Sequence, residues 1–303
     1  MDSRTVLITG CSSGFGRGMV PEFLKHGWTV IATLRNGEVR SGLFARELEA
    51  HPGRLSVVSL DVTDPEERAA LAETIRTRCG ELDCLVNNAG YALFGALEDL
   101  SEVQIRRQME VNFWGTVLLT RELLPFLRRA RGRIINLSSV LGHCGFPLTS
   151  AYCASKFALE GFTEALSHEL RPHRVQVALV EPGRHRTRFS DNVEWGDGST
   201  RLGSAYIPQS QNYRRLKDML ASRKGAGADP VVRAVVRLAS MKRMPLRRRV
   251  GWDAVLVHLV QRLLPEQLTW RLFSTVYDGM FLRDPRPRRG RSQSHVAPEL
   301  RQD

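Results

Sequence analysis

Tyr152 and Lys156 stand four positions apart in the stretch AYCASKFALEG, residues 151–161. Residues at i and i+4 share one face of a helix, so the two side chains can lie together. A free tyrosine has a pKa of about 10, and a neighbouring cation lowers that pKa by stabilising the phenolate. The pair could therefore exchange a proton with a substrate oxygen near neutral pH. The same spacing also occurs in solvated helical pairs, so the interpretation needs support from other residues.

Two further polar residues are expected close to this pair. Ser139 comes just after the apolar run RIINL (133–137) and thirteen residues before Tyr152. Asn112, in VNFWGT, is expected in the helix that follows NNAG (87–90). Ligands of open α/β sheets bind at the carboxyl ends of the strands, so these residues should meet at one rim.

The segment TGCSSGFG, residues 9–16, has glycines at 10, 14 and 16 between an apolar run and a helical pattern. Glycine permits positive φ and a close approach of ligand to backbone. The helix that follows offers unpaired N–H groups and the positive end of its dipole to a phosphate. The spacing is GxxxGxG, whereas the usual dinucleotide fingerprint is GxGxxG. We interpret the segment as a dinucleotide phosphate site; the alternative is a tight turn without a ligand.

The residue after the second apolar run, TVIATL (29–34), is Arg35. An acidic residue at this place would bind a ribose 2′-hydroxyl and favour NAD. An arginine suits a 2′-phosphate instead, because its guanidinium offers a fork of donors, and Ser13 could add a hydroxyl. The sequence thus predicts NADP (NADPH) as the cofactor, with NAD less favoured. The alternative is that Arg35 is a solvated residue at a strand end.

Six short apolar runs alternate with longer segments of helical spacing along the first 180 residues. Apolar runs without strict alternation suit strands that are buried on both faces. Their repetition predicts a parallel sheet with helices on both sides and right-handed crossovers. The predicted fold class is therefore α/β, a doubly wound parallel sheet (Rossmann fold). The predicted strands cover residues 5–9, 29–34, 55–60, 82–86, 133–137 and 175–180.

We expect a single domain over residues 1–283, whose C-terminal part loses the regular alternation. Residues 183–228 are rich in Gly, Ser, Asn, Arg and Asp and are expected to form a substrate loop. A helix at 230–240 and a short strand near 248–251 should follow. Residues 284–303, dominated by Pro, Arg, Ser and Gln, are expected to be a disordered basic tail.

Residues 253–283 carry apolar side chains at helical spacing, among them Leu259, Leu263, Leu268 and Leu272. The interpretation that we favour is a C-terminal helical pair that closes the substrate side of the domain. The other interpretation is an amphipathic surface helix that contacts a membrane or a partner.

The composition excludes several classes of protein. The chain of 303 residues is 42% apolar and 25% charged, as soluble globular proteins are. It has no apolar run of about 18 residues that could span a bilayer and no signal-peptide pattern after MDSR. The five cysteines show no CxxC pairing, and no cluster has metal-ligand spacing. We therefore expect a cytoplasmic protein that binds no metal.

The formal net charge is +12, and much of it lies at 241–250 and 283–291. A basic balance can attract nucleic acid or an anionic membrane. No nucleic-acid motif accompanies the arginines, and they are not interleaved with exposed aromatic residues. We expect no nucleic-acid partner and interpret the charge as a solvated face and tail beside an anionic cofactor. Peripheral membrane contact stays open.

Together, these motifs resemble those of the classical short-chain dehydrogenase/reductase family over residues 4–190. Within the family, YCASKFALEG and ATLRN are most similar to 17β-hydroxysteroid dehydrogenase and retinol dehydrogenase-like members. The matching motifs, in their order and spacing, are the glycine loop at 9–16, Asp61-Val62, NNAG at 87–90, Asn112, Ser139, Tyr152 with Lys156, and Pro182-Gly183.

The resemblance implies a role for each matching residue. Tyr152 would be the general acid in carbonyl reduction and the base in alcohol oxidation. Lys156 would lower the pKa of Tyr152 and hold the nicotinamide ribose. Ser139 would bind the substrate oxygen together with Tyr152, and Asn112 would anchor a water. The implied cofactor-binding residues are Gly10, Ser12, Ser13, Gly14, Phe15, Gly16, Arg35, Asp61, Val62, Asn88, Ala89, Gly90, Tyr152, Lys156, Pro182, Gly183 and Thr187.

The implied function is that of an NADP-dependent oxidoreductase. It would interconvert a hydroxyl and a carbonyl group on a small hydrophobic alcohol or ketone, steroid- or retinoid-like, by hydride transfer. Members of the family commonly form homo-oligomers through two helices of the sheet, but the C-terminal extension of this chain could block one of these interfaces, so a homo-oligomer stays an open alternative. The alternative is a catalytically weak, dinucleotide-sensing regulatory module.

One departure from the family pattern is Arg184-His185, directly after Pro182-Gly183. These two residues could reach the nicotinamide or an acidic substrate, or they could be solvated. Several other residues could line the substrate pocket, although packing explains each of them equally well. They are Leu93, Phe94, His143, Cys144, Phe146, Phe189 and Trp195.

Overall fold

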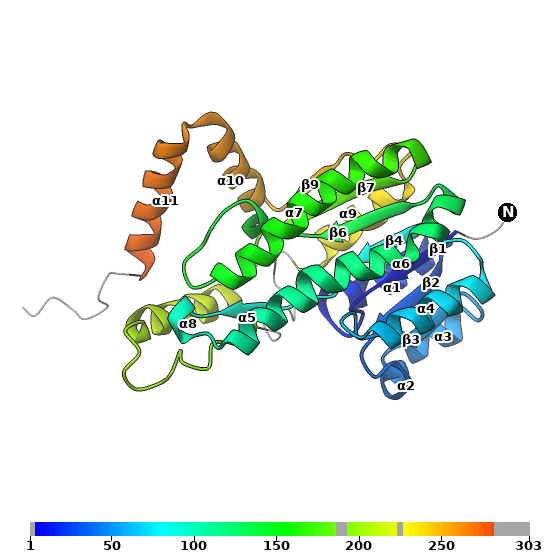
Figure 1. Ribbon diagram of the computed structural model, residues 1–303, viewed down its shortest axis with the longest axis horizontal. Helices are drawn as coiled ribbons and strands as arrows, with labels where there is room; N and C mark the ends of the chain where they lie inside the picture. Colours follow the sequence, from blue (N-terminus) through cyan, green and yellow to red (C-terminus); the bar gives the residue numbers. More distant parts are fainter. Residues whose placement is uncertain (1–3, 186–192, 223–226, 282–303) are drawn as a thin grey trace, which may run out of the picture.

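The computed structural model of the protein describes residues 4–185, 193–222 and 227–281 (Figure 1). Its centre is a sheet of seven parallel strands in the order β3-β2-β1-β4-β6-β7-β9. The strands that the sequence predicts are all present, with ends shifted by up to two residues. They are β1 (Thr5–Ile8), β2 (Thr29–Leu34), β3 (Leu55–Ser59), β4 (Cys84–Asn87), β6 (Arg133–Leu137), β7 (Gln176–Pro182) and β9 (Arg247–Val250).

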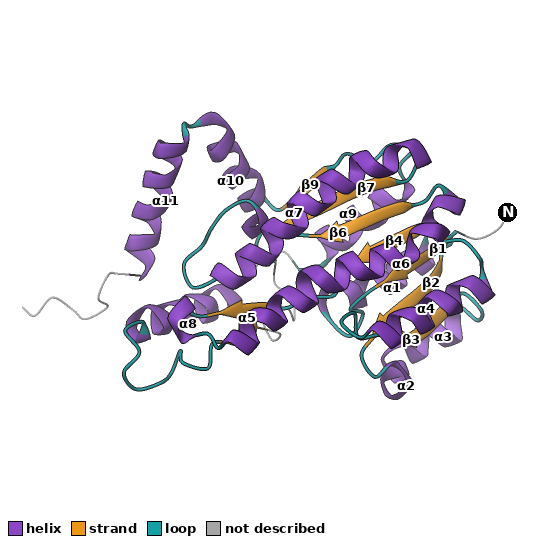
Figure 2. Ribbon diagram, in the orientation of Figure 1, coloured by secondary structure: helices purple, strands orange, loops and turns teal. Residues whose placement is uncertain are grey.

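Helices cover both faces of this sheet (Figure 2). On one face lie α1 (Gly14–Lys25) and α9 (Asp229–Ser240), and on the other α4 (Pro65–Arg78), α6 (Gly115–Ala130) and α7 (Ser150–Leu170). Strands covered on both faces have no solvent side, which is why their sequences are continuous apolar runs. The predicted doubly wound α/β fold is thus confirmed.

Strand β1 shows how the sheet divides its side chains between two cores. Val6 and Ile8 point to the core under α1 and α9, and Leu7 points to the core under α4 and α6. The parallel register sets Val6 opposite Val30 of β2 and Cys84 of β4. All of these side chains are at most 4% exposed.

The chain order reverses at β1. From this strand the sheet continues through β2 and β3 on one side and through β4, β6, β7 and β9 on the other. Crossovers that leave in opposite directions open a crevice at the carboxyl ends of the strands, where doubly wound sheets bind ligands. The glycine loop follows β1, Asn88 follows β4 and Ser139 follows β6, so these predicted site residues share this rim.

Further elements extend beyond the rim (Figure 1). Strand β5 (Ala92–Phe94) pairs in parallel with β8 (Val193–Trp195), and α8 (Ile207–Ser222) follows. Helices α10 (Trp252–Leu263) and α11 (Glu266–Phe281) form a hairpin. The short elements are α2 (Gly37–Arg40), η1 (Ser41–Phe44), α3 (Ala45–Ala50), η2 (Leu97–Asp99), α5 (Glu102–Met109), the π turn η3 (Glu110–Trp114), η4 (Val140–Gly142) and η5 (Arg171–His173).

Helix α8 lies inside the segment that the sequence analysis expected to be a loop. Its buried and half-buried positions include Gln209, Ser210 and Tyr213. A helix whose packed face mixes polar and aromatic side chains shows little apolar periodicity. The sequence pattern therefore did not predict α8. In the described part of the chain, no helix is both long and apolar enough to cross a membrane.

Candidate active site

The glycine loop joins β1 to α1 and lies against the end of β4. Gly10 and Gly14 have φ of 71° and 56°, a region that glycine adopts without strain. A Cβ at Gly10 would lie 2.8 Å from the Cα of Ala89, so only glycine allows this close approach. The side chain of Asn88 donates to the main-chain oxygens of Thr9 (2.8 Å) and Gly10 (3.1 Å). The loop thus presents the N-terminus of α1 to the rim, as a phosphate site requires.

Thr9 opens this loop and was not among the predicted site residues. Its Oγ1 accepts hydrogen bonds from the main-chain N–H groups of Asn88 and Ala89, both at 2.9 Å. Asn88 therefore supports the cofactor site by holding the loop, and its side-chain amide is engaged there. Gly90 is packed next to Asn112, because a Cβ at Gly90 would lie 3.0 Å from the Asn112 Oδ1.

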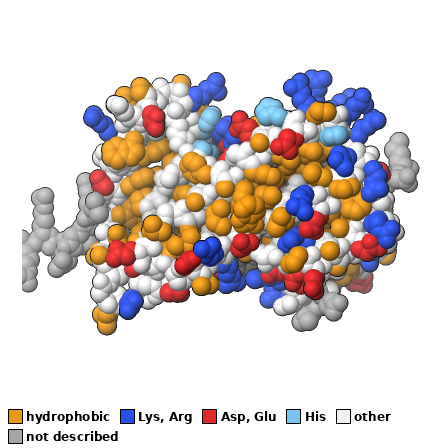
Figure 3. All heavy atoms as spheres, viewed as in Figure 1, with side chains coloured by type: hydrophobic (Ala, Val, Ile, Leu, Met, Phe, Trp, Pro, Cys, Tyr) orange, Lys and Arg blue, Asp and Glu red, His pale blue; other side chains and the backbone are white. Residues whose placement is uncertain are grey.

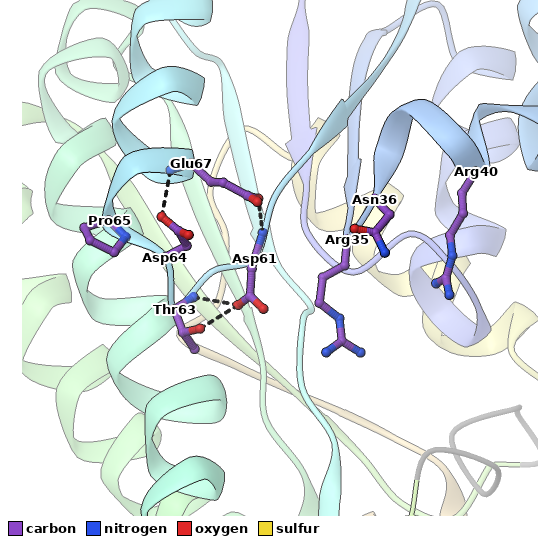
Figure 4. Close-up of a pocket in the computed structure, with 8 residues that line it drawn as sticks. All are labelled: Arg35, Asn36, Arg40, Asp61, Thr63, Asp64, Pro65 and Glu67. Carbon is purple, nitrogen blue, oxygen red and sulfur yellow. Dashed lines mark hydrogen bonds between the residues drawn. The ribbon is translucent and has the colours of Figure 1, made fainter.

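A cleft of about 560 Å³ lies beyond the ends of β2 and β3 (Figure 4). Arg35 and Arg40 lie on its α2 side, and Figure 4 shows their guanidinium groups extending in the same direction. Both arginines are exposed, and neither forms an ion pair within the described residues. Two cations in one cleft suit a phosphate. Arg40 therefore adds a second cation to the site that the sequence predicted for Arg35 alone. Arg40 was missed because its short helix has no periodic pattern.

Asp61 and Thr63 form the opposite side of this cleft (Figure 4). The Asp61 carboxylate accepts hydrogen bonds from the main-chain N–H (2.9 Å) and hydroxyl (2.7 Å) of Thr63. Burial alone would raise the pKa of Asp61, but these hydrogen bonds and the charges of Arg35 and Arg107 hold it below its usual range. Asp61 is thus an ionised acceptor at the rim. Val62, by contrast, is buried in the core on the α6 side.

Tyr152 and Lys156 lie one turn apart on the buried face of α7. The Lys156 Nζ lies 5.8 Å from the centre of the Tyr152 ring and donates to the main-chain oxygen of Leu137 at 2.8 Å. The Tyr152 hydroxyl forms a side-chain hydrogen bond with Ser139. The Ser139 Oγ also accepts from the N–H of Leu141 at 3.2 Å, which fixes its direction. The three residues that the sequence predicted to act together are thus in contact at the end of β6.

Burial shifts the pKa values of both titratable members of this group. It raises the pKa of Tyr152 above its usual value, while the hydrogen bond with Ser139 acts in the opposite direction. Burial also lowers the pKa of Lys156 to about 8. Tyr152 is therefore protonated at neutral pH, and the ammonium group of Lys156 lies on the same side of the helix. Perturbed groups of this kind are typical of active sites.

A chain of buried amide and hydroxyl groups fixes α6 and α7 on the sheet. The Asn87 side-chain N–H₂ donates to the Thr120 Oγ1 at 3.0 Å and to the Asn136 Oδ1 at 2.8 Å. The Asn136 Nδ2 in turn donates to the Thr163 Oγ1 of α7 at 2.9 Å. Hydrogen bonds between buried polar groups rigidify their surroundings, so this chain holds the helix that carries Tyr152, although the Oδ1 of Asn87 has no partner among the described residues.

Asn112 lies in the π turn η3 between α5 and α6 and is 1% exposed. Its Nδ2 donates to the main-chain oxygen of Tyr91 (2.9 Å) and to the Ser155 Oγ (3.2 Å). Its Oδ1 accepts from the Tyr91 N–H at 3.1 Å. Both the amide hydrogens and the oxygen of this side chain are thus engaged, and they join η3 to α7 and to the segment after β4. A π turn interrupts the helical hydrogen-bond ladder and often marks a functional site.

The turn after β7 receives support from α10 that the sequence did not predict. The N–H of Arg184 donates to the Asp253 Oδ2 at 2.5 Å, and Gly183 leaves room for that carboxylate. His185 lies edge-on to Phe15 of the glycine loop, with ring centres 5.9 Å apart. Phe15 and His185 thus face each other across the rim. Pro182 ends β7 and is buried, whereas Thr187 lies outside the described residues.

Aromatic rings cover Tyr152 on the side away from the sheet. Phe94 packs against Tyr152 with a centroid distance of 6.4 Å and against Tyr213 of α8 at 5.1 Å. Trp195, Phe146 and Phe281 surround Tyr213 at 5.7, 5.8 and 5.7 Å. We call Phe94, Phe146, Trp195, Tyr213 and Phe281 the aromatic cluster.

The residues that the sequence predicted to line the substrate pocket lie in different parts of the structure. Phe94, Phe146 and Trp195 belong to the aromatic cluster, whereas Leu93 is fully buried in a separate core. His143 and Cys144 lie in the loop after Ser139, next to α10 and α11. Tyr213 and Phe281 were not predicted, because no sequence pattern indicates that α8 packs against α11. Phe189 lies outside the described residues.

These features bring a glycine loop, an arginine-lined cleft and a buried, protonated tyrosine to one rim. A nicotinamide dinucleotide fits this set of groups, because its phosphates could meet the N-terminus of α1 and the arginines, with Tyr152 nearby. The protein is thus an oxidoreductase of the nicotinamide-dependent, doubly wound class. Within the described ranges, no group of three or more His, Cys, Asp or Glu side chains could hold a metal ion.

Comparisons with known proteins agree with this class. The family model for short chain dehydrogenases matches residues 4–196. A 3-ketodihydrosphingosine reductase of Bacteroides thetaiotaomicron is 34% identical over 89% of this chain and 94% of its own length. Retinol dehydrogenase 8 of Homo sapiens is 38% identical over 82% of this chain and 81% of its own.

Solved structures show the same relationship. A short-chain dehydrogenase from Streptomyces avermitilis is 32% identical, with a TM-score of 0.77 over 92% of this chain and 99% of the other. A short chain dehydrogenase from Burkholderia cenocepacia, in complex with NADP, has 26% identity and a TM-score of 0.70 over 89% of this chain and 98% of its own. The chain therefore belongs to the short-chain dehydrogenase/reductase family, and the predicted resemblance is confirmed. It is an NAD(P)-dependent oxidoreductase that acts on hydroxyl or carbonyl groups.

Proposed function

We propose that the protein is an NADP-dependent enzyme that interconverts a hydroxyl and a carbonyl group on a hydrophobic, steroid- or retinoid-like molecule. The observation that carries this proposal is Tyr152, held between Ser139 and Lys156 under the aromatic cluster. A proton donor, an oxygen-binding hydroxyl and apolar walls are what reduction of a hydrophobic ketone requires.

The residues would divide the chemistry among them as follows. Bound NADPH would supply the hydride. Tyr152 would donate its proton to the substrate oxygen, which Ser139 would orient from the other side. Lys156 would stabilise the resulting phenolate and bind the ribose next to the nicotinamide. The side-chain amide hydrogens and oxygen of Asn112 are engaged, so a water at η3 would be held by its main-chain oxygen.

The preference for NADP over NAD would come from Arg35 and Arg40. A charge-assisted hydrogen bond contributes about 1.5–3 kcal/mol, which corresponds to roughly 10- to 100-fold in affinity. We expect Arg35→Asp to weaken NADPH binding by about this factor and to strengthen NADH binding, because a carboxylate here would accept from a 2′-hydroxyl. Fluorescence titration with both cofactors measures the change.

The matched control for this substitution is Arg46→Asp on α3, which makes the same charge change at an exposed residue outside the cleft. The control should leave both dissociation constants unchanged. Equal preference for NADPH and NADH before and after Arg35→Asp would contradict the assignment of NADP.

The proposed substrate class rests on the aromatic cluster and on what the relatives are named for. Two relatives are named for 3-ketodihydrosphingosine and for retinol, both of them hydrophobic. We expect oxidation of NADPH with bulky apolar ketones or aldehydes, and KM values at least tenfold higher for short polar ketones, which would leave the aromatic walls unfilled. Loss of NADPH absorbance over a graded panel tests this. Tight NADPH binding without turnover of any panel member would favour the sensing alternative instead.

A homo-oligomer would use the outer faces of α6 and α7. Trp114 of η3 and Phe157 of α7 are 45% and 47% exposed, and hydrophobic side chains gather over these helices at the centre of Figure 3. Exposed apolar patches of this kind mark interfaces. We also propose a cytoplasmic location, which is compatible with five free cysteines.

A further inference from the structure

Helix α10 turns its apolar stripe toward solvent. Apolar positions at i, i+3, i+4, i+7 and i+11 normally face the core of a globular protein. On α10 the only buried residue is Ala254. The exposed stripe consists of Trp252, Val255, Leu256, Leu259 and Leu263, with exposed fractions between 43% and 77%.

The neighbouring helix continues this surface. Leu264, Leu268, Leu272, Val276 and Met280 recur every four residues from the turn to the end of α11, and each is between 38% and 50% exposed. Trp270 is 70% exposed but borders the cavity on the inner side of the hairpin, so it does not belong to these stripes. We call the two exposed stripes the hairpin face. Figure 1 shows the hairpin standing away from the sheet.

Polar contacts on the inner side fix this orientation. Gln261 of α10 donates its Nε2 hydrogen to the main-chain oxygen of His143 at 2.8 Å, and its Oε1 lies 2.9 Å from the His143 Nδ1. Asp253 accepts from the Arg184 N–H. Rotating α10 to bury its stripe would break these contacts, so the apolar side is held outward. An outward apolar surface of this extent requires an occupant.

The C-terminal residues are poor in apolar side chains and rich in arginine. Residues 282–303 contain only three large aliphatic residues, Leu282, Val296 and Leu300. The stretch 283–291, which starts two residues after α11 ends, carries five arginines and one aspartate. Apolar helices next to a run of arginines combine the two signals that hold a protein on an anionic bilayer.

A second copy of the chain is a poorer occupant. Joining two hairpin faces would bring together two chains of net charge +12 at the start of their arginine-rich ends. The exposed Trp114 of η3 and Phe157 of α7 already offer a separate surface for self-association. The exposed Trp252 on the stripe of α10 instead suits the interface between lipid headgroups and acyl chains.

We propose that the hairpin face docks on the surface of an anionic phospholipid bilayer. The cavity next to it shows what docking would do for the site. A cavity of about 750 Å³ lies between the hairpin and the loop 143–147, and its walls include Phe146, Trp270 and Tyr277. Tyr277 and Phe281 of α11 pack on Phe146, at 4.8 and 5.6 Å between ring centres. Docking therefore brings the aromatic cluster beside the bilayer, where a substrate dissolved in lipid is concentrated; this last step rests on the proposed function.

The test is flotation of the full-length protein with vesicles of phosphatidylcholine alone or mixed with phosphatidylserine. We expect at least tenfold more bound protein on the mixed vesicles, and loss of this excess at high salt. The double variant Leu259→Glu/Leu263→Glu should lower binding to the mixed vesicles at least tenfold. Replacing the five arginines at 283–291 with glutamine should remove the preference for anionic lipid. The matched control Leu97→Glu/Val103→Glu changes two exposed apolar residues outside the hairpin and should bind like the unchanged protein.

Three results would overturn docking: no excess on mixed vesicles at low salt, full binding by Leu259→Glu/Leu263→Glu, or a dimer in sedimentation velocity that this variant dissociates. Unchanged NADPH affinity in each variant shows that the fold is intact. Turnover of a water-soluble ketone should be the same in all of them. If no ketone is reduced but flotation behaves as expected, the proposed function fails while docking holds.

Discussion

Replacement of Tyr152 by phenylalanine is expected to lower kcat for carbonyl reduction by about 10³-fold. The ring, its contact with Phe94 and the packing of α7 remain, but the proton donor next to Ser139 is removed. NADPH affinity should change by less than about threefold, because the phenol supplies little of the binding energy compared with the phosphate contacts. Steady-state rates with the best ketone of the panel, together with fluorescence titration of NADPH, separate the two effects.

Tyr91→Phe is the matched control for this variant. It also removes one buried hydroxyl, which has no hydrogen-bond partner among the described residues, on the segment that follows β4. Its removal leaves no group unpaired, so kcat should stay within about twofold. If Tyr152→Phe retained more than a tenth of the activity, or if both variants lost it equally, Tyr152 would not be the proton donor.

The sheet and the rim could be predicted because both depend on local sequence. Strands covered on two faces must be apolar throughout, so runs such as TVLIT and RIINL identify them without knowledge of the rest of the fold. Parallel strands end at one edge, so any polar motif directly after a strand is carried to the same rim. This is why Ser139, Tyr152 and Lys156 were predicted to meet and do meet.

The missed features depend on contacts between distant segments. Arg40 joins Arg35 only because α2 folds back beside the end of β2. Tyr213 packs on Phe94, the ring beside Tyr152, only because α8 lies against β5 and α11. The sequence showed that 253–283 would be helical and amphipathic, but the outward direction of the stripe is set by Gln261 and Asp253. Periodicity identifies an apolar side of a helix and leaves open what that side faces.

Lys156→Met is expected to abolish most activity and yet to stabilise the protein in the absence of cofactor. Burial lowers the pKa of Lys156 from 10.5 to about 8, so keeping it charged in the fold at neutral pH costs on the order of 3 kcal/mol. Methionine fills the same space without that cost but loses the hydrogen bond to Leu137. We expect the free energy of unfolding to rise by about 1–2 kcal/mol and kcat to fall by about 10²-fold or more.

The pH dependence of the difference in stability identifies its cause. Between pH 8 and 10.5 the unfolded chain holds the Lys156 proton and the folded chain releases it, so the unmodified protein gains stability relative to the variant as pH rises. The gap in Tm between Lys156→Met and the unmodified protein should therefore be largest below pH 8 and should shrink toward pH 10.5. Lys25→Met, at an exposed lysine of α1, should show no such gap. A gap independent of pH would mean that packing, and not the buried charge, separates the two proteins. A gap that closes over this window would show that the active site holds its lysine at the expense of stability, as a residue retained for catalysis would be.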